Sequence, residues 1–169
     1  MAFNAYLTLT GRKQGPIKGG VLEKGREGQI AVYAFRHNIN VPLDPLSGQA
    51  RGFRQYAPII ITKEIDQSSP ALHNMIATNE LITDLKVEFY GSSPKPGRRA
   101  SAGHEALLYT ITLTDAVLTG MNTLMENNRV EPGKTLPVLE ELAFNFRSIE
   151  WLWPNGNFMA ADDFLRPGA

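Results

Sequence analysis

Alternating apolar and polar residues dominate the chain and predict a protein built mainly from β-strands. Successive side chains on a strand point to opposite faces, so strict alternation marks strands with one buried face. The alternating segments are rich in β-branched and aromatic residues, which favour strands. We expect strands over 3–10, 29–36, 58–66, 84–90, 106–114 and 142–151, and a further strand over 116–125 in which Gly120 is a candidate bulge. In the segment over 142–151, the predicted core residues are Leu142, Phe144, Phe146 and Trp151.

One segment has helical rather than strand periodicity. Ser68 and Ser69 provide an N-cap serine, and Pro70 suits the first helical position. Leu72, Met75 and Ile76 then recur at helical spacing. We therefore expect one short helix over about 70–79, flanking a β-barrel or sandwich.

Three segments have the composition of loops. Residues 15–28 are rich in glycine, and residues 92–104 form a basic connection between two strands. Residues 40–57 form a long loop that combines arginines with aromatic residues. Long loops in compact domains are usually functional, and this composition favours a protein–protein contact. The alternative is a long hairpin packed on its own domain.

The composition is that of a globular protein and excludes several classes of function. The chain has 169 residues, of which 43% are hydrophobic and 20% charged. The formal net charge is zero, which argues against a nucleic-acid binder or an anionic-membrane binder. There is no cysteine, so disulfides, cysteine-based zinc sites and thiol nucleophiles are excluded. No stretch approaches 18 apolar residues and no secretory leader is recognisable, so we expect neither a membrane span nor a cleaved signal peptide.

The zero net charge hides an asymmetry along the chain. Residues 1–56 hold eight basic and three acidic residues, whereas residues 57–169 hold nine basic and fourteen acidic residues. Surfaces of opposite sign could attract each other between copies of the chain. The alternative is that the two sets interleave on the folded surface.

A search for catalytic, cofactor-binding or metal-binding residues identifies none. The chain lacks a Walker loop, G-x-G-x-x-G, H-E-x-x-H and G-x-S-x-G. Its three histidines are more than 30 residues apart, and no spacing suggests a metal site; they are His37, His73 and His104. Glu140–Glu141 and Asp162–Asp163 are interpreted as solvated or interface charges. We therefore predict a protein that is not an enzyme and needs no cofactor.

Several longer motifs resemble one known family. They are the runs over 42–52, 61–72 (Ile-Thr-Lys-Glu-Ile-Asp-Gln-Ser-Ser-Pro-Ala-Leu), 109–116, 140–151 (ending Phe-Arg-Ser-Ile-Glu-Trp) and 162–164. In this order and over essentially the whole chain, they resemble the Hcp family (haemolysin-coregulated proteins) of bacterial type VI secretion systems. The family commonly has tryptophan where this chain has Phe164.

The resemblance implies a fold and a mechanical function. The fold would be one domain over 1–169, a two-sheet β-barrel with one short flanking helix, like that of phage tail-tube proteins. The chain would form homohexameric rings that stack into the secretion tube, with a VgrG-type spike, sheath proteins and effector cargo as partners. It would stay in the cytoplasm until type VI export. A free-ring chaperone for secreted effectors and a tail-tube protein of another contractile injection system remain as alternatives.

The same resemblance places the expected contact residues. The loop over 40–57 resembles the family's extended loop, which reaches a neighbouring subunit or ring. Candidate interface residues in this loop are Asp44, Arg51, Arg54 and Tyr56. Lys63, Glu64 and Asp66 end a predicted strand; they form either a subunit contact or a solvated strand end that discourages edge pairing.

Overall fold

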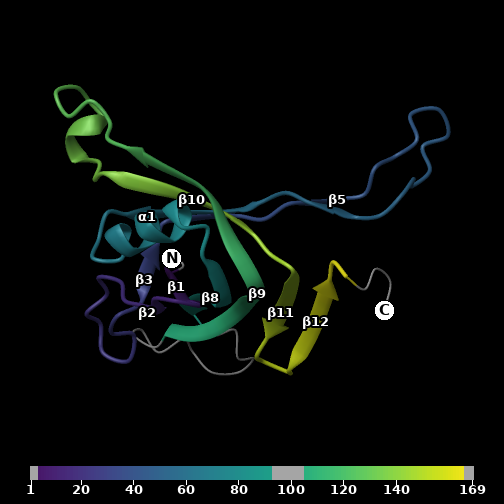
Figure 1. Ribbon diagram of the computed structural model, residues 1–169, viewed down its shortest axis with the longest axis horizontal. Helices are drawn as coiled ribbons and strands as arrows, with labels where there is room; N and C mark the ends of the chain where they lie inside the picture. The colour runs from purple at the N-terminus through teal and green to yellow at the C-terminus, as the bar shows by residue number, and fades with distance from the viewer. Residues whose placement is uncertain (1–3, 93–104, 166–169) are drawn as a thin grey trace.

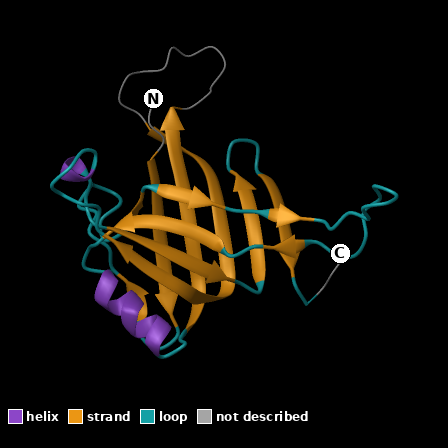
Figure 2. Ribbon diagram, turned by 90° about the horizontal axis from the view of Figure 1, so that it is seen from above, coloured by secondary structure: helices purple, strands orange, loops and turns teal. Residues whose placement is uncertain are grey.

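A long, curved strand at the centre of the molecule organises the other strands (Figures 1 and 2). The computed structural model describes residues 4–92 and 105–165. The predicted loop over 92–104 lies almost entirely outside this range, as does His104. The elements are β1 (Asn4–Gly11), β2 (Gly15–Ile17), β3 (Ile30–Val32), β4 (Ala34–Arg36), β5 (Ile39–Asn40), β6 (Gln55–Tyr56), β7 (Ile59–Glu64), α1 (Ser69–Ala77), β8 (Leu81–Ser92), β9 (Glu105–Leu124), η1 (Gly133–Thr135), β10 (Leu139–Asn145), β11 (Ser148–Trp153) and β12 (Phe158–Asp163).

The central strand is β9, which joins the two expected strands over 106–114 and 116–125 into one. Its first half pairs with β8 and β11, and its second half pairs with β10. The register with β10 shifts where Ala143 lies opposite Gly120 but Phe144 lies opposite Leu118, so the bulge falls beside the predicted glycine. Because a bulge increases local twist, β9 can pass from one layer of the fold into the other.

The main sheet has ten strands, in the order β2-β1-β8-β9-β10-β7-β4 with three strands off this path. On the open side, the segment over 30–36 passes between the layers: β3 pairs with β1, and β4 pairs with β7. Between them the Tyr33 amide donates to the Thr62 carbonyl at 2.8 Å. The two predicted sheets are thus two layers that share β9. Strand pairing is interrupted between β3 and β4, so the sheet does not close into a complete barrel. The expectation of a mainly β fold with one flanking α-helix is confirmed.

Apolar side chains from both layers fill the interior. Leu142 and Phe144 are fully buried, Phe146 is buried and Trp151 packs at the margin, as the alternation predicted. The central buried set comprises Leu7, Leu9, Ile59, Ile61, Leu85, Val87, Ile111 and Leu113. Along β7 these residues alternate strictly with half-buried ones, whereas in β1 the buried Tyr6 directly precedes Leu7. Burial of this face supplies the main driving force for the fold.

The helix α1 packs beside the strands, in contact with β9 (Figure 2). It spans Ser69–Ala77, close to the predicted 70–79, with a proline in its first turn. Leu72 and Met75 are fully buried and form its core-facing side. The predicted serine N-cap makes no side-chain capping bond. The Ser68 hydroxyl donates to the Asp66 carboxylate instead.

A buried ion pair joins α1 to the sheet. Lys63 of β7 has no exposed surface, and its ammonium lies 2.8 Å from Glu140 of β10, directly across the ladder. The same ammonium donates to Ser69 at 3.0 Å and to the Glu64 carbonyl at 2.7 Å, and it lies 3.0 Å from Asp66. Lys63 was expected at a contact or a solvated strand end, and Glu140 as a solvated or interface charge. Both expectations are wrong, because each side chain points into the protein and finds its partner there.

Asp66 connects this buried pair to the glycine-rich loop. One carboxylate oxygen accepts from Ser68, and the other accepts from the Gly20 amide at 2.9 Å. Burial alone would raise the pKa of Asp66, but the bonds from Ser68, Lys63 and Gly20 outweigh it and hold that pKa below its ordinary value. Asp66 therefore stays ionised at neutral pH and fixes the loop against β7.

Replacing Lys63 with methionine should destabilise the protein strongly. The substitution leaves the Glu140 carboxylate buried without its cation, which costs about 3–5 kcal/mol of unfolding free energy. Adding Glu140→Leu removes the orphaned charge and should recover most of that loss. Urea unfolding at one fixed protein concentration measures both effects. The control is Lys86→Met, on the opposite face of β8 from the core; a Lys63→Met protein as stable as this control would contradict the assignment.

Candidate assembly interface

The loop predicted over 40–57 forms a hairpin that projects from the body of the protein (Figure 1). We call residues 37–57 the arm. Its two sides are joined by the β5–β6 ladder and, further out, by a bond of 2.7 Å from the Arg51 amide to the Pro42 carbonyl. At the tip, the Asp44 carboxylate accepts from the Leu46 amide at 2.8 Å. Asp44 thus builds the turn at the tip of the arm.

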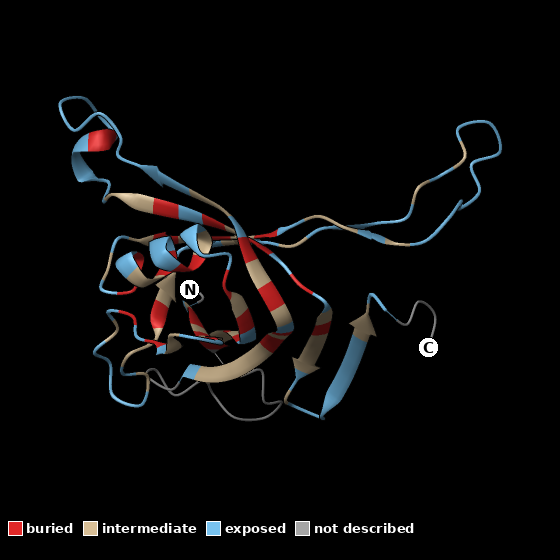
Figure 3. Cartoon of the chain, viewed as in Figure 1, coloured by how far each residue is buried: buried red, intermediate tan, exposed pale blue. Residues whose placement is uncertain are grey.

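Most of the outer part of the arm is exposed (Figure 3), and its exposed residues include large apolar ones. Leu46 is 98% exposed, Phe53 74% and Leu43 65%. The alternative of a hairpin packed on its own domain therefore does not hold. Apolar side chains grouped on a projecting element indicate a surface that another protein covers.

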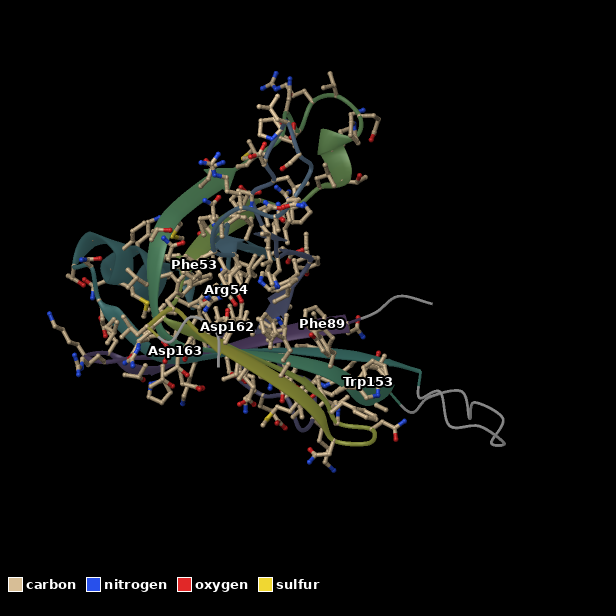
Figure 4. All side chains as sticks on the ribbon, turned by 90° about the vertical axis from the view of Figure 1, so that its right-hand side faces the viewer. Phe53, Arg54, Phe89, Trp153, Asp162 and Asp163 are labelled. Carbon is tan, nitrogen blue, oxygen red and sulfur yellow. The ribbon has the colours of Figure 1, made fainter. Side chains whose placement is uncertain are left out.

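An arginine–aspartate clamp holds the base of the arm against β12. The Arg54 guanidinium donates through two nitrogens to the Asp162 carboxylate and, at 3.0 Å, to the Asp163 carbonyl (Figure 4). The Tyr56 hydroxyl donates to the same carboxylate at 2.6 Å. A bidentate pair of this kind fixes both distance and orientation. Arg54 and Tyr56, predicted as contact residues, thus anchor the arm within the protomer.

The clamp changes the titration of its members. The bonds from Arg54 and then from Tyr56 hold the pKa of Asp162 below its ordinary value, despite partial burial. Burial and the bond to Asp162 raise the pKa of Tyr56 to about 12. At neutral pH, Asp162 is therefore ionised and Tyr56 is a neutral donor, which is the combination that the clamp requires.

Aromatic stacking completes the anchor. The His37 ring lies parallel to Tyr56, with ring centroids 6.0 Å apart, and stacks on Trp151 at 5.9 Å. Tyr56 also meets Phe146 and Phe164 edge-on, at 5.3 and 5.1 Å. Burial lowers the pKa of His37, which favours the neutral imidazole. Both strands of the arm are thus packed at their base while the tip remains exposed.

The seven predicted contact residues fall into two separate groups. Arg51, Arg54 and Tyr56 lie on the arm with Asp44, and Arg51 is 3.7 Å from Asp44 with its side chain 80% exposed. Lys63, Glu64 and Asp66 lie at the far end of β7. Lys63 and Asp66 pair with each other. Glu64 is half-buried, and among the described residues it pairs with no cation.

Sequence reasoning missed the roles of Asp162 and His37. Asp162 was interpreted as a solvated or interface charge, although the run over 162–164 contributed to the resemblance. The sequence favours a surface histidine at position 37, whereas the His37 ring is half-buried and stacked between Tyr56 and Trp151. In both cases the signal lies in long-range pairing, since the partners of Asp162 are 106 and 108 residues away.

The described residues contain no group of three or more histidines, aspartates or glutamates arranged to hold a metal ion. Within the same residues, no helix combines the length and apolarity needed to cross a membrane.

Comparison with known proteins identifies a family. A family model described as "Type VI secretion system effector, Hcp" matches residues 6–153. The chain is 32% identical over 179 aligned positions to the "Major exported protein" of Pseudomonas aeruginosa, covering 100% of this chain and 99% of that protein.

Solved structures agree. The fold matches Hcp1 of E. coli EAEC 042 with a TM-score of 0.82 and 28% identity, over 96% of this chain and 99% of the other. It matches the secreted protein Hcp3 of Pseudomonas aeruginosa with a TM-score of 0.75 and 27% identity, over 96% and 98%. The chain therefore belongs to the Hcp family of type VI secretion system proteins.

Proposed function

We propose that this chain is the structural subunit of a type VI secretion inner tube, forming hexameric rings that stack and are exported with effectors in their lumen. The observation that carries the proposal is the arm: a projecting hairpin with a rigidly anchored base and an exposed apolar tip. A subunit that acts alone gains nothing from such a feature, whereas a subunit that contacts its neighbours needs it. We further propose that the arm makes a contact between copies, as the family resemblance implies.

The proposal extends to partners and to location. The VgrG-type spike, the sheath and effector cargo would be partners through the assembled tube rather than through one protomer. The protein would remain in the cytoplasm until export and would perform no catalysis.

Light scattering coupled to gel filtration tests the assembly. Six copies of the 18.7 kDa chain give a mass on the order of 110 kDa, and electron microscopy should show annular particles. A strict monomer over a hundredfold range of concentration would overturn the proposal.

Arg54→Glu should weaken assembly without unfolding the protomer. The substitution places two carboxylates together at the base of the arm, so the arm loses its orientation while the core is untouched. Circular dichroism should be unchanged and the oligomeric mass reduced. Arg129→Glu makes the same charge change on the exposed β9–β10 connection and should leave the mass unchanged. A swapped pair, Arg54→Asp with Asp162→Arg, should restore it, and an unaltered ring population for Arg54→Glu would contradict the role of the clamp.

The clamp should also respond to pH through Asp162. The pKa of Asp162 is lower in the folded chain than in the unfolded one, so its contribution is complete above pH ~4 and is lost as the pH falls through the folded value. The measurement is amide hydrogen exchange of residues 37–57, compared at each pH between Asp162→Asn and the unmodified protein. Loss of a charge-assisted bond should make exchange in the variant roughly tenfold faster at pH 7. The two rates should converge at acidic pH, and a ratio independent of pH would contradict the assignment.

A further inference from the structure

A groove lies at the end of β7 that is farthest from the arm. It has a volume of about 260 Å³ and is lined by Gly20, Val21, Ala31, Tyr33, Glu64, Ile65 and Asp66. Small or aliphatic side chains form much of the lining. Tyr33 is 58% exposed and Ile65 50%, so the apolar walls of the groove face solvent.

The groove also presents the carboxylate of Glu64, which pairs with no cation among the residues that the structure describes. Asp66 already accepts from Lys63, Ser68 and the Gly20 amide. The Glu64 carboxylate interacts with the neutral Tyr33, and burial together with this interaction raises the pKa of Tyr33. The groove thus offers apolar walls and one negative charge.

The tip of the arm has the complementary chemistry. Leu46 is almost completely exposed at its end. Arg51 lies on the same hairpin, and its long contact with Asp44 leaves the guanidinium largely in solvent. An aliphatic side chain and a cation on one hairpin fit an aliphatic groove that contains a carboxylate.

The arm cannot reach this groove in its own protomer. It projects from one side of the body, whereas β3 and the 20–21 segment, which line the groove, lie on the opposite side (Figure 1). Its base is held at that distance by Arg54 and Tyr56. An arm tip that enters this groove must therefore come from another copy of the chain.

We infer that the groove lined by Val21, Ile65 and Glu64 receives the arm tip of a second copy, with Leu46 in the groove and Arg51 paired with Glu64. This contact joins two different surfaces, so it repeats from copy to copy and generates a ring or a filament rather than a closed dimer. The inference rests on the proposed self-assembly and adds the surface that accepts the arm.

A disulfide test suits this chain because it has no cysteine of its own. Leu46→Cys and Ile65→Cys are prepared as separate proteins of different tag length, mixed and oxidised. If the inference is right, a mixed-length covalent dimer predominates on a non-reducing gel. The double variant, Leu46→Cys with Ile65→Cys, should give a ladder of covalent multimers.

A matched control separates docking from random collision. Met125 is 60% exposed on the β9–β10 connection, comparable to Ile65. Leu46→Cys mixed with Met125→Cys should give at least tenfold less cross-linked dimer. Equal yields from the two mixtures would overturn the inference.

Charge reversal tests the ion pair. Arg51→Glu and Glu64→Arg should each reduce the association constant roughly fivefold, the size expected for a partly exposed pair. Their combination should restore association. Two single reversals without effect would remove the ion pair from the contact.

These outcomes distinguish this inference from the proposed function. Hexameric mass without the Leu46–Ile65 cross-link overturns the groove assignment and leaves self-assembly intact. A monomer at all concentrations removes both. Circular dichroism of each single variant checks folding, and the mixing experiment does not depend on the double variant.

Discussion

The ammonium group of Lys63 sets the constraint on which the rest of the fold depends. A charge without exposed surface is tolerated only where oxygen atoms surround it, and here they come from β10, α1 and the residues after β7. Lys63 and Glu140 are direct cross-strand partners, so the pair also fixes the register between β7 and β10. A slip of β7 by one residue would turn Lys63, Ile59 and Ile61 to the solvent face and leave the Glu140 carboxylate buried without its cation. Register in β7 in turn fixes the direction in which the arm leaves the sheet.

Two anchors of different chemistry therefore hold β7 and the arm that precedes it. The Lys63 cluster is dry and packed beside the core, and the Arg54–Asp162 clamp is partly exposed and reinforced by aromatic rings. The first stabilises the protomer. The second stabilises an orientation, which matters to a neighbour but contributes little to the protomer's own core. In the proposed assembly, residues with purely internal contacts would control association without touching the partner.

Local patterns predicted most elements, and long-range pairing accounts for the differences. The spacing of Leu72, Met75 and Ile76 located the helix, and period-two alternation located most of the long strands. The expected strands over 29–36 and 142–151 are each divided into two strands, β3 and β4 and β10 and β11, and β12 was not predicted. The same alternation puts Lys63 on the face of Ile59 and Ile61, but orientation alone does not reveal a partner 77 residues away. The merger of two expected strands into β9 was hidden because its bulge resembles a break. The arm's composition indicated a contact surface, whereas its anchor on β12 depends on a pairing that no local pattern reports.

The six residues of β7 have a further consequence. The arm leaves at the start of this strand and the groove opens at its end, and an extended segment of this length spans roughly 20 Å. In the proposed assembly, one inextensible strand therefore connects the contact that a subunit makes to the contact that it receives. A force applied to one neighbour would reach the next along the backbone of β7, which is hydrogen-bonded to β10 on one side and to β4 on the other. The force would therefore shear the pairing of β4, β7 and β10 rather than bend loops.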